Sequence, residues 1–321
     1  NKEIIDKDGN NVNYSLLALK HNTVYMQSPS LFDDVYDSEI NIDYYEYQKY
    51  RLMEYCRRCG VMVDERETVE EIGNELLTAI IKSIENNKNY NHIFTVSPTS
   101  EIESLSNEIF INKLRLGLAA NQDLGQIVSK IITEEYQKYS EELKNTFRIS
   151  CFTTTPYSQL MWGGAYADGH NGFCVEYSIC PKDEKYKELY NNLFPVVYCK
   201  IRPNITKELV GWQDRDMTKE YVWYIYYYGV LRKSIDWAFQ NEWRLLLPLS
   251  EKHGDNCNVE FFPITRVYLG NRMQKEKRKE IIDFCNNNSI PYIGVKRNSN
   301  IYEMQECGMK CEDCYKYIGL E

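Results

Sequence analysis

Hydrophobic positions follow two different spacings along this chain. Between residues 41 and 145 they recur at steps of three and four, which is typical of amphipathic helices. A capping box at Ser100 and Glu103 fits the same interpretation. We predict a helical block over residues 41–145, with two long apolar faces: Val69, Ile72, Leu76, Leu77, Ile80, Ile81 and Ile84, and then Leu124, Ile127, Val128, Ile131, Ile132, Tyr136 and Tyr139.

On both sides of this block, short apolar or alternating runs predict strands. The runs cover residues 23–28, 147–153, 172–177, 196–201, 242–247, 259–262, 266–269 and 291–295. Shorter helical patterns cover residues 159–167, 183–192, 218–239 and 274–287. Strands that bracket a helical block predict an α+β fold with a mixed or split, mostly antiparallel sheet. The expected domains are a core of residues 1–40 and 146–300, a helical insertion of residues 41–145, and a Cys-containing tail of residues 301–321.

Composition narrows the function classes. The 321 residues are 43% hydrophobic and 26% charged, as in ordinary globular proteins, and the net charge is −9. A general nucleic-acid binder needs a surplus of positive charge, so we expect no general nucleic-acid binding. No run reaches the roughly 20 apolar residues of a membrane helix, and the sequence begins without an apolar signal region. We therefore expect a cytoplasmic protein that is not bound to a membrane.

The chain has 11 cysteines. Most lie singly in apolar runs and are typical of reduced thiols in the cytoplasm. Cys56 with Cys59, and Cys311 with Cys314, form two Cys-x-x-Cys pairs that together have the ligands of a structural zinc site. The alternative is two unrelated pairs of reduced thiols.

Common catalytic motifs are missing from the sequence. It contains no phosphate-binding P-loop, no dinucleotide-binding G-x-G-x-x-G, no zinc-protease H-E-x-x-H and no G-x-S-x-G elbow. None of the four histidines, His21, His92, His170 and His253, is spaced as a metal ligand from another. These absences argue against P-loop hydrolysis, Rossmann redox chemistry and zinc hydrolysis.

Several segments carry an unusual density of aromatic and polar residues. They are Phe32–Asp37, Ile149–Thr155, Leu160–Asp168, Gly172–Glu176, Lys233–Arg244 and Arg266–Gly270. In order and content they resemble the bacterial, uncharacterised family called domain of unknown function 2971. The resemblance spans about residues 14 to 295, without the helical insertion and the tail.

The chain departs from the family pattern in four places. Gly164 and Ala165 stand where the family has a His before Tyr166, and Gln240 replaces the first Glu of an E-x-E pair. Asp33-Asp34-Val35 replaces Asn-Asp-Pro, and the family's opening strand has no clear counterpart before Tyr14. The resemblance implies no established activity.

A second resemblance, to ADP-ribosyltransferases of the Arg–Ser–Glu type, does imply an activity. It rests on Ser150 in one strand and on Gln240-x-Glu242 opening another. Cleavage of the nicotinamide–ribose bond of NAD develops positive charge on the ribose, which a fixed carboxylate such as Glu242 stabilises. In this hypothesis Gln240 orients the acceptor and Ser150 supports Glu242. Aromatic stacking and charge recognition would bind the nucleotide through Trp162, Tyr166, Asp168, Lys233 and Arg244.

We therefore expect an NAD-using ADP-ribosyltransferase-like effector of a bacterial cell, of the toxin or phage-defence type, or an NAD glycohydrolase. NAD would be its substrate, and a protein partner or antitoxin would accompany it. Each residue also has an ordinary structural role: Glu242 with Arg244 as a surface ion pair, Ser150 as a strand Ser, and Trp162 as core.

Two other functions stay open. One is a non-catalytic binding module around residues 221–243, and the other is a metal-dependent nuclease or phosphotransfer enzyme using Asp33, Asp34, Glu176 and Glu242.

Overall fold

A computed structural model describes residues 4–5, 11–85, 130, 133–134, 137, 144–145, 147–164, 166–213, 226–249 and 257–310. The chain divides into two compact units, and each is described separately. The first unit comprises residues 1–33, 145–198 and 233–321, and the second comprises residues 34–144 and 199–232. Helices and mainly antiparallel sheets confirm the α+β prediction. In the described part of the chain, no helix has both the length and the apolar character to span a bilayer.

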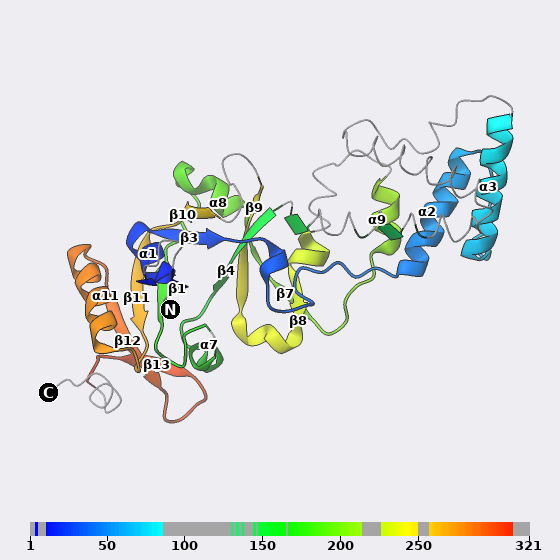
Figure 1. Ribbon diagram of the computed structural model, residues 1–321. Helices are drawn as coiled ribbons and strands as arrows, with labels where there is room; N and C mark the ends of the chain where they lie inside the picture. Colours follow the sequence, from blue (N-terminus) through cyan, green and yellow to red (C-terminus); the bar gives the residue numbers. More distant parts are fainter. Residues whose placement is uncertain are drawn as a thin grey trace. The chain divides into compact units, whose positions relative to one another are not determined.

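The first unit is built on two larger sheets. One has the strand order β13-β12-β11-β5, and the other has the order β4-β9-β6. Their bounds are β4 Phe147–Thr153, β5 Phe173–Tyr177, β6 Leu193–Pro195, β9 Glu242–Pro248, β11 Ile264–Leu269, β12 Tyr292–Arg297 and β13 Met304–Cys307. Among the strands that the structure describes, only β11 and β12 pair in parallel, and helix α11 (Lys275–Asn287) connects them (Figure 1).

Smaller elements complete this unit. Strand β3 (Thr23–Met26) pairs with β10 (Cys257–Glu260), and β1 (Ile4–Ile5) pairs with β2 (Asn11–Val12). Strands β7 (Val197–Cys199) and β8 (Arg232–Ser234) form a two-stranded sheet where the chain leaves and re-enters the unit. The helices are α1 Tyr14–His21, η1 Pro29–Leu31, α7 Gln159–Gly163, η2 Glu184–Tyr186, α8 Lys187–Asn191 and η4 Ile235–Gln240.

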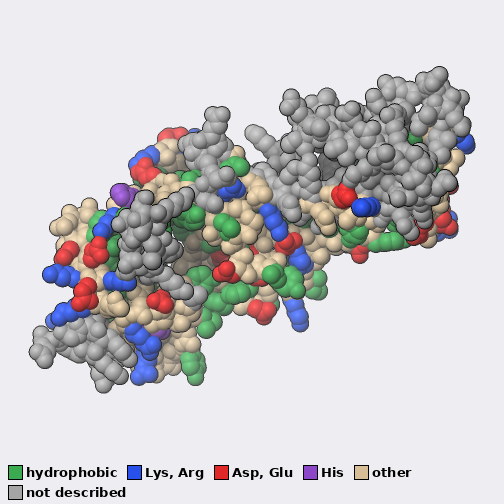
Figure 2. All heavy atoms as spheres, in the orientation of Figure 1, with side chains coloured by type: hydrophobic (Ala, Val, Ile, Leu, Met, Phe, Trp, Pro, Cys, Tyr) green, Lys and Arg blue, Asp and Glu red, His purple; other side chains and the backbone are tan. Residues whose placement is uncertain are grey.

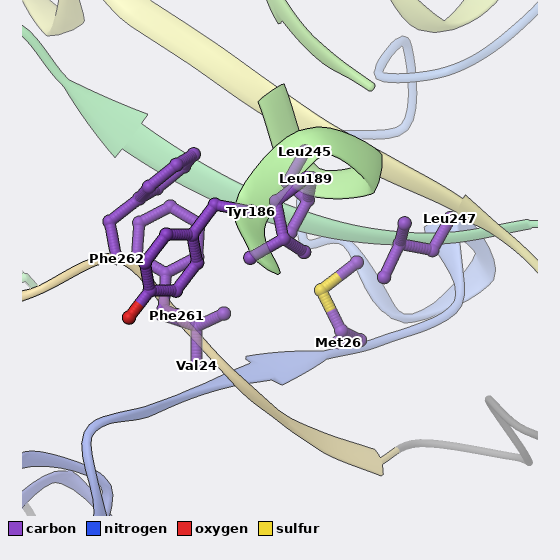
Figure 3. Close-up of a cluster of buried hydrophobic side chains, with 8 residues drawn as sticks. All are labelled: Val24, Met26, Tyr186, Leu189, Leu245, Leu247, Phe261 and Phe262. Carbon is purple, nitrogen blue, oxygen red and sulfur yellow. The ribbon is translucent and has the colours of Figure 1, made fainter. Parts of the chain in front are cut away.

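The apolar core of this unit covers one face of β9. Leu245 and Leu247 are fully buried there, against Met26 of β3 and Leu189 of α8 (Figure 3). Phe152 of β4 packs on the same cluster. Because successive strand residues point to opposite faces, Glu242, Arg244 and Leu246 point away from this core. The alternation in β9 therefore separates an apolar face from a face that carries charge.

The second unit contains helices α2 (Tyr44–Arg58), α3 (Val69–Glu85), α9 (Thr206–Gln213) and η3 (Tyr226–Val230). Helix α3 confirms the first of the two predicted helices, since its residues Ile72, Leu76 and Ile80 are buried. A capping box begins it: the Glu71 amide donates to Thr68 Oγ1 and the Thr68 amide donates to Glu71 Oε2. The predicted capping box at Ser100 and most of the predicted helix over residues 124–139 lie outside the described residues.

One predicted helix is wrong in part. Residues 218–239 were expected to be one helix, but Arg232–Ser234 form strand β8, and a short 3₁₀ helix follows. Ser234 begins that helix by accepting a hydrogen bond from the Asp236 amide, and Asn241 ends it with a left-handed backbone. Helical spacing cannot detect these stops, because they depend on side-chain capping and on pairing with β7.

Candidate functional site

Glu242 is the first residue of β9, the central strand of its sheet. Its carboxylate accepts two charged hydrogen bonds. Arg244 Nε lies 2.7 Å from Oε1, and Lys233 Nζ lies 3.0 Å from Oε2. The side chains of Arg244, Glu242 and Lys233 are 0%, 4% and 9% exposed. This is a buried ion cluster, and the alternative of an ordinary surface pair does not apply.

The charge state of Glu242 follows from these contacts. Burial alone would raise the pKa of the Glu242 carboxyl. The charges of Arg244 and Lys233, with hydrogen bonds from Arg244 and the Cys151 thiol, outweigh burial and lower this pKa below its ordinary value. Glu242 is therefore an ionised carboxylate at neutral pH.

A chain of hydrogen bonds leads from Glu242 toward the surface. Lys233 Nζ also donates to Gln240 Oε1 at 2.9 Å, and Gln240 Nε2 donates to the Tyr166 hydroxyl. Gln240 is 3% exposed, whereas Tyr166 is 56% exposed. We name Tyr166, Lys233, Gln240, Glu242 and Arg244 the Glu242 cluster. The structure thus brings together five of the eight residues selected from the sequence.

Gln240 reaches the cluster by a different route from the expected one. It was expected two residues before Glu242 on the same strand face, but it ends the 3₁₀ helix before β9. Asn241, with a φ of 44°, separates it from the strand. The shared partner Lys233, and not strand alternation, joins Gln240 to Glu242.

Ser150 does not join the cluster. In the β4–β9 register it is opposite Leu245, while Cys151 is opposite Arg244 and Thr153 is opposite Glu242. Directly opposite residues of an antiparallel pair share a face, so Ser150 lies on the apolar-core face. Cys151 and Thr153 are the β4 residues on the face of Glu242, and the thiol of the exposed Cys151 hydrogen-bonds to Glu242.

The remaining two selected residues lie elsewhere. Trp162 is 3% exposed and packs in an apolar cluster with Tyr268, Val295 and Met304, and its Nε1 donates to the Pro156 carbonyl at 2.6 Å. Trp162 is therefore a core residue. Asp168 is exposed, has a φ of 49°, and lines a cavity of about 150 Å³ beside the start of α11.

The residues of the metal alternative are not gathered. Glu176 on β5 accepts hydrogen bonds from the Tyr268 hydroxyl at 2.6 Å and Thr265 Oγ1 at 2.7 Å. No group of three His, Cys, Asp or Glu side chains that could hold a metal occurs among the described residues. Cys311 and Cys314 of the zinc prediction lie outside the described residues. Burial raises the pKa of the Cys56 thiol of the other pair to about 12.

Residues that were not selected as site residues also contact the cluster. The Glu242 amide donates to the Tyr198 hydroxyl at 2.8 Å. The Arg244 guanidinium lies 5.5 Å from the Phe32 ring centroid, and Lys233 Nζ lies 5.3 Å from that of Trp237, both within cation–π range. Strand alternation could have identified Cys151, but Tyr198 and Phe32 meet the cluster only through tertiary packing.

A family model described as protein of unknown function (DUF2971) matches residues 161–245. The resemblance is confirmed over that segment. It contains every member of the Glu242 cluster, from Tyr166 to Arg244. Neither curated proteins nor solved structures gave a match.

Charged side chains of both signs are interspersed over the face seen in Figure 2. Lys and Arg alternate with Asp and Glu there, among the described residues, without a broad field of one sign.

Proposed function

We propose that the Glu242 cluster binds NAD and cleaves its nicotinamide–ribose bond, passing the ADP-ribosyl group to water or to another acceptor. The observation that supports this proposal best is the state of Glu242. It is an ionised carboxylate held in one place by Arg244 and Lys233. A fixed carboxylate stabilises positive charge that develops on a ribose more than a solvated one does.

Lys233 and Arg244 have different roles in this proposal. Each carboxylate oxygen already accepts a hydrogen bond from a cation, so a ribose hydroxyl gains fuller access to Glu242 when one cation moves away. Lys233 is the more exposed of the two and is already shared with Gln240. Lys233 then turns to the pyrophosphate and frees Oε2 for the ribose, while Arg244 keeps Oε1 in place. Phosphate oxygens are good acceptors for both cation types.

The reaction is balanced without a further reactant. The bond between ribose C1′ and the nicotinamide nitrogen breaks, and its electron pair leaves with nicotinamide. C1′ then bonds to the oxygen of water or another nucleophile, which releases a proton. Ser150 has no role in this scheme, because it lies on the opposite face of the sheet. On the same strand, Cys151 is the residue that hydrogen-bonds to Glu242.

Nicotinamide release from NAD by the purified protein, with cell lysate to supply acceptors, tests the proposal. We expect Glu242→Gln to lower the rate about 100-fold or more, as loss of a main electrostatic group does. The matched control is Glu260→Gln, which removes an exposed carboxylate paired with Lys185. Absence of release from the wild-type protein would contradict the proposal.

Two further measurements keep the test decisive if Glu242→Gln folds poorly. Glu242→Asp retains the charge but withdraws it by one methylene, so we expect folded protein with a strongly reduced rate. The second is alkylation of Cys151, which is exposed and contacts Glu242. NAD at saturation should slow alkylation of Cys151, read by peptide mass spectrometry, while Cys257 on β10 serves as the reference thiol. Equal rates with and without NAD would argue against binding at this cluster.

A further inference from the structure

A second cavity of the first unit is lined by no residue of the Glu242 cluster and has features of a ligand site. Its volume is about 500 Å³, within the range of small-molecule pockets. Helix α7, the loop after it, and the ends of β12 and β13 form its wall. The lining residues that matter here are Leu160, Gly163, Gly164, His170, Arg297 and Met304.

Arg297 gives this cavity its charge. It is the last residue of β12 and is exposed. In the part of the chain that the structure describes, no ion pair or side-chain hydrogen bond engages its guanidinium. A planar guanidinium with five donors matches the two oxygens of a carboxylate or phosphate. An arginine with its donors available on a cavity wall points to an oxyanion ligand.

His170 is held against the same cavity by an unusual backbone. Asp168, Gly169 and His170 have consecutive φ values of 49°, 62° and 71°. Two non-glycine residues in this region are uncommon, and such conformations persist only where the surroundings impose them. Here the His170 amide donates to the Trp162 carbonyl at 2.9 Å, and the His170 carbonyl accepts from the Arg272 amide at 3.1 Å.

Two glycines fit this loop against its neighbours. A Cβ on Gly270 would lie 2.1 Å from the His170 carbonyl oxygen, so only glycine allows the loop to approach. A Cβ on Gly163 would lie 3.8 Å from His170 Nε2, which is ordinary contact. The imidazole therefore faces the α7 wall of the cavity, and Gly163 leaves room there for a ligand.

We infer that this cavity binds a small molecule with a phosphate or carboxylate group attached to an apolar body. Arg297 binds the oxyanion, and His170 provides a second polar contact. Leu160, which is 53% exposed, and Met304 line an apolar part of the wall. The inference does not rest on the proposed NAD reaction, because no residue of the Glu242 cluster lines this cavity.

Calorimetric titration with phenyl phosphate, and with inorganic phosphate for comparison, tests this inference. We expect phenyl phosphate to bind the wild-type protein more tightly than inorganic phosphate, because only phenyl phosphate uses the apolar wall. Arg297→Gln should weaken binding at least tenfold. Lys279→Gln, which removes an exposed charge from α11, is the matched control and should bind as the wild type does.

A steric variant tests whether phenyl phosphate binds in this cavity or is attracted only by the overall charge of the protein. Gly163→Leu keeps every charge and places a side chain in the cavity, so it should also weaken phenyl phosphate binding at least tenfold. Any of three results would overturn the inference: no binding by folded wild-type protein at millimolar ligand, equal affinity of Arg297→Gln, or equal affinity of Gly163→Leu.

Discussion

Two carboxylates on the two larger sheets, Glu242 and Glu176, both have a lowered pKa, for different reasons. At Glu176 the Tyr268 and Thr265 hydroxyls supply hydrogen bonds, and the carboxylate stands at an exposed position on β5. At Glu242 two cations act against the effect of burial. The direction of the shift is the same, but the surroundings differ in exposure and charge.

The difference shows that a lowered pKa does not measure how much the fold depends on a group. Loss of the Glu176 charge leaves only the neutral Tyr268 and Thr265 hydroxyls beside an exposed position. Loss of Glu242 leaves Arg244 and Lys233 in a buried place without their shared counter-ion. Breaking such a buried ionic contact is far more costly than breaking an exposed one.

The largest expected effect comes from Glu242→Gln. We expect it to destabilise the protein by about 3–5 kcal/mol, the usual cost of removing one partner of a buried ion pair. Urea unfolding followed by circular dichroism would measure this loss. Glu176→Gln is the matched variant on the other sheet, and we expect about 1 kcal/mol there. Equal losses at the two positions would contradict the comparison.

A triple variant tests whether the cost lies in unpaired charge. In Lys233→Met, Glu242→Met and Arg244→Met combined, no buried charge of the cluster remains. Apolar replacements of a whole buried ion cluster are often neutral in stability. We therefore expect the triple variant to regain about 2 kcal/mol or more over Glu242→Gln, although it should release no nicotinamide. A triple variant less stable than Glu242→Gln would show that the ions themselves stabilise the fold.

The ionisation of Glu242 should make the stability of the protein depend on pH. Its pKa is lower in the folded protein than in the unfolded chain, where a Glu titrates near about 4.3. The resulting stabilisation is complete above that unfolded-state value and is lost as the pH falls through the folded-state pKa. The difference in melting temperature between wild type and Glu242→Gln should therefore narrow between pH 6 and pH 3. A constant difference would mean that Glu242 is not the group responsible.

The smallest expected effects are at two separate contacts that contain no buried charge. Tyr268→Phe removes the hydroxyl that bonds to Glu176, and we expect a loss of about 1 kcal/mol. Lys185→Gln breaks an ion pair whose partners are 55% and 59% exposed, and we expect less than about 0.5 kcal/mol. Thermal unfolding at one pH would rank the two. A larger loss for Lys185→Gln would reverse the order that exposure predicts.

Periodicity predicted the elements that are long or clearly alternating. Strand β4 matches its predicted bounds, and α11 and β9 differ from theirs by one residue each. The helix α1 and the strand β13 were not predicted, because elements of 8 and 4 residues are too short to show a clear period. The pairing of β11 with β12 in parallel depends on the path of α11, which local spacing does not contain.

The candidate site was predictable where the residues are close in sequence. Lys233, Gln240, Glu242 and Arg244 lie in one motif, and the structure joins them. Ser150 was misplaced because its face depends on a register that a shift of one residue reverses. Trp162 was misplaced because a large aromatic residue in a motif and one in a core look alike in a sequence.

Gly270 couples the shapes of the two cavities of the first unit. The loop that rests on it contributes Asp168 and Asn171 to the cavity beside α11, and His170 to the cavity beside α7. A single added methyl group at Gly270 would push the loop away and reshape both hollows, although every lining residue would be unchanged. A substitution at Gly270 therefore changes both cavities at once, whereas a substitution in one wall, such as Gly163→Leu, acts on one cavity alone.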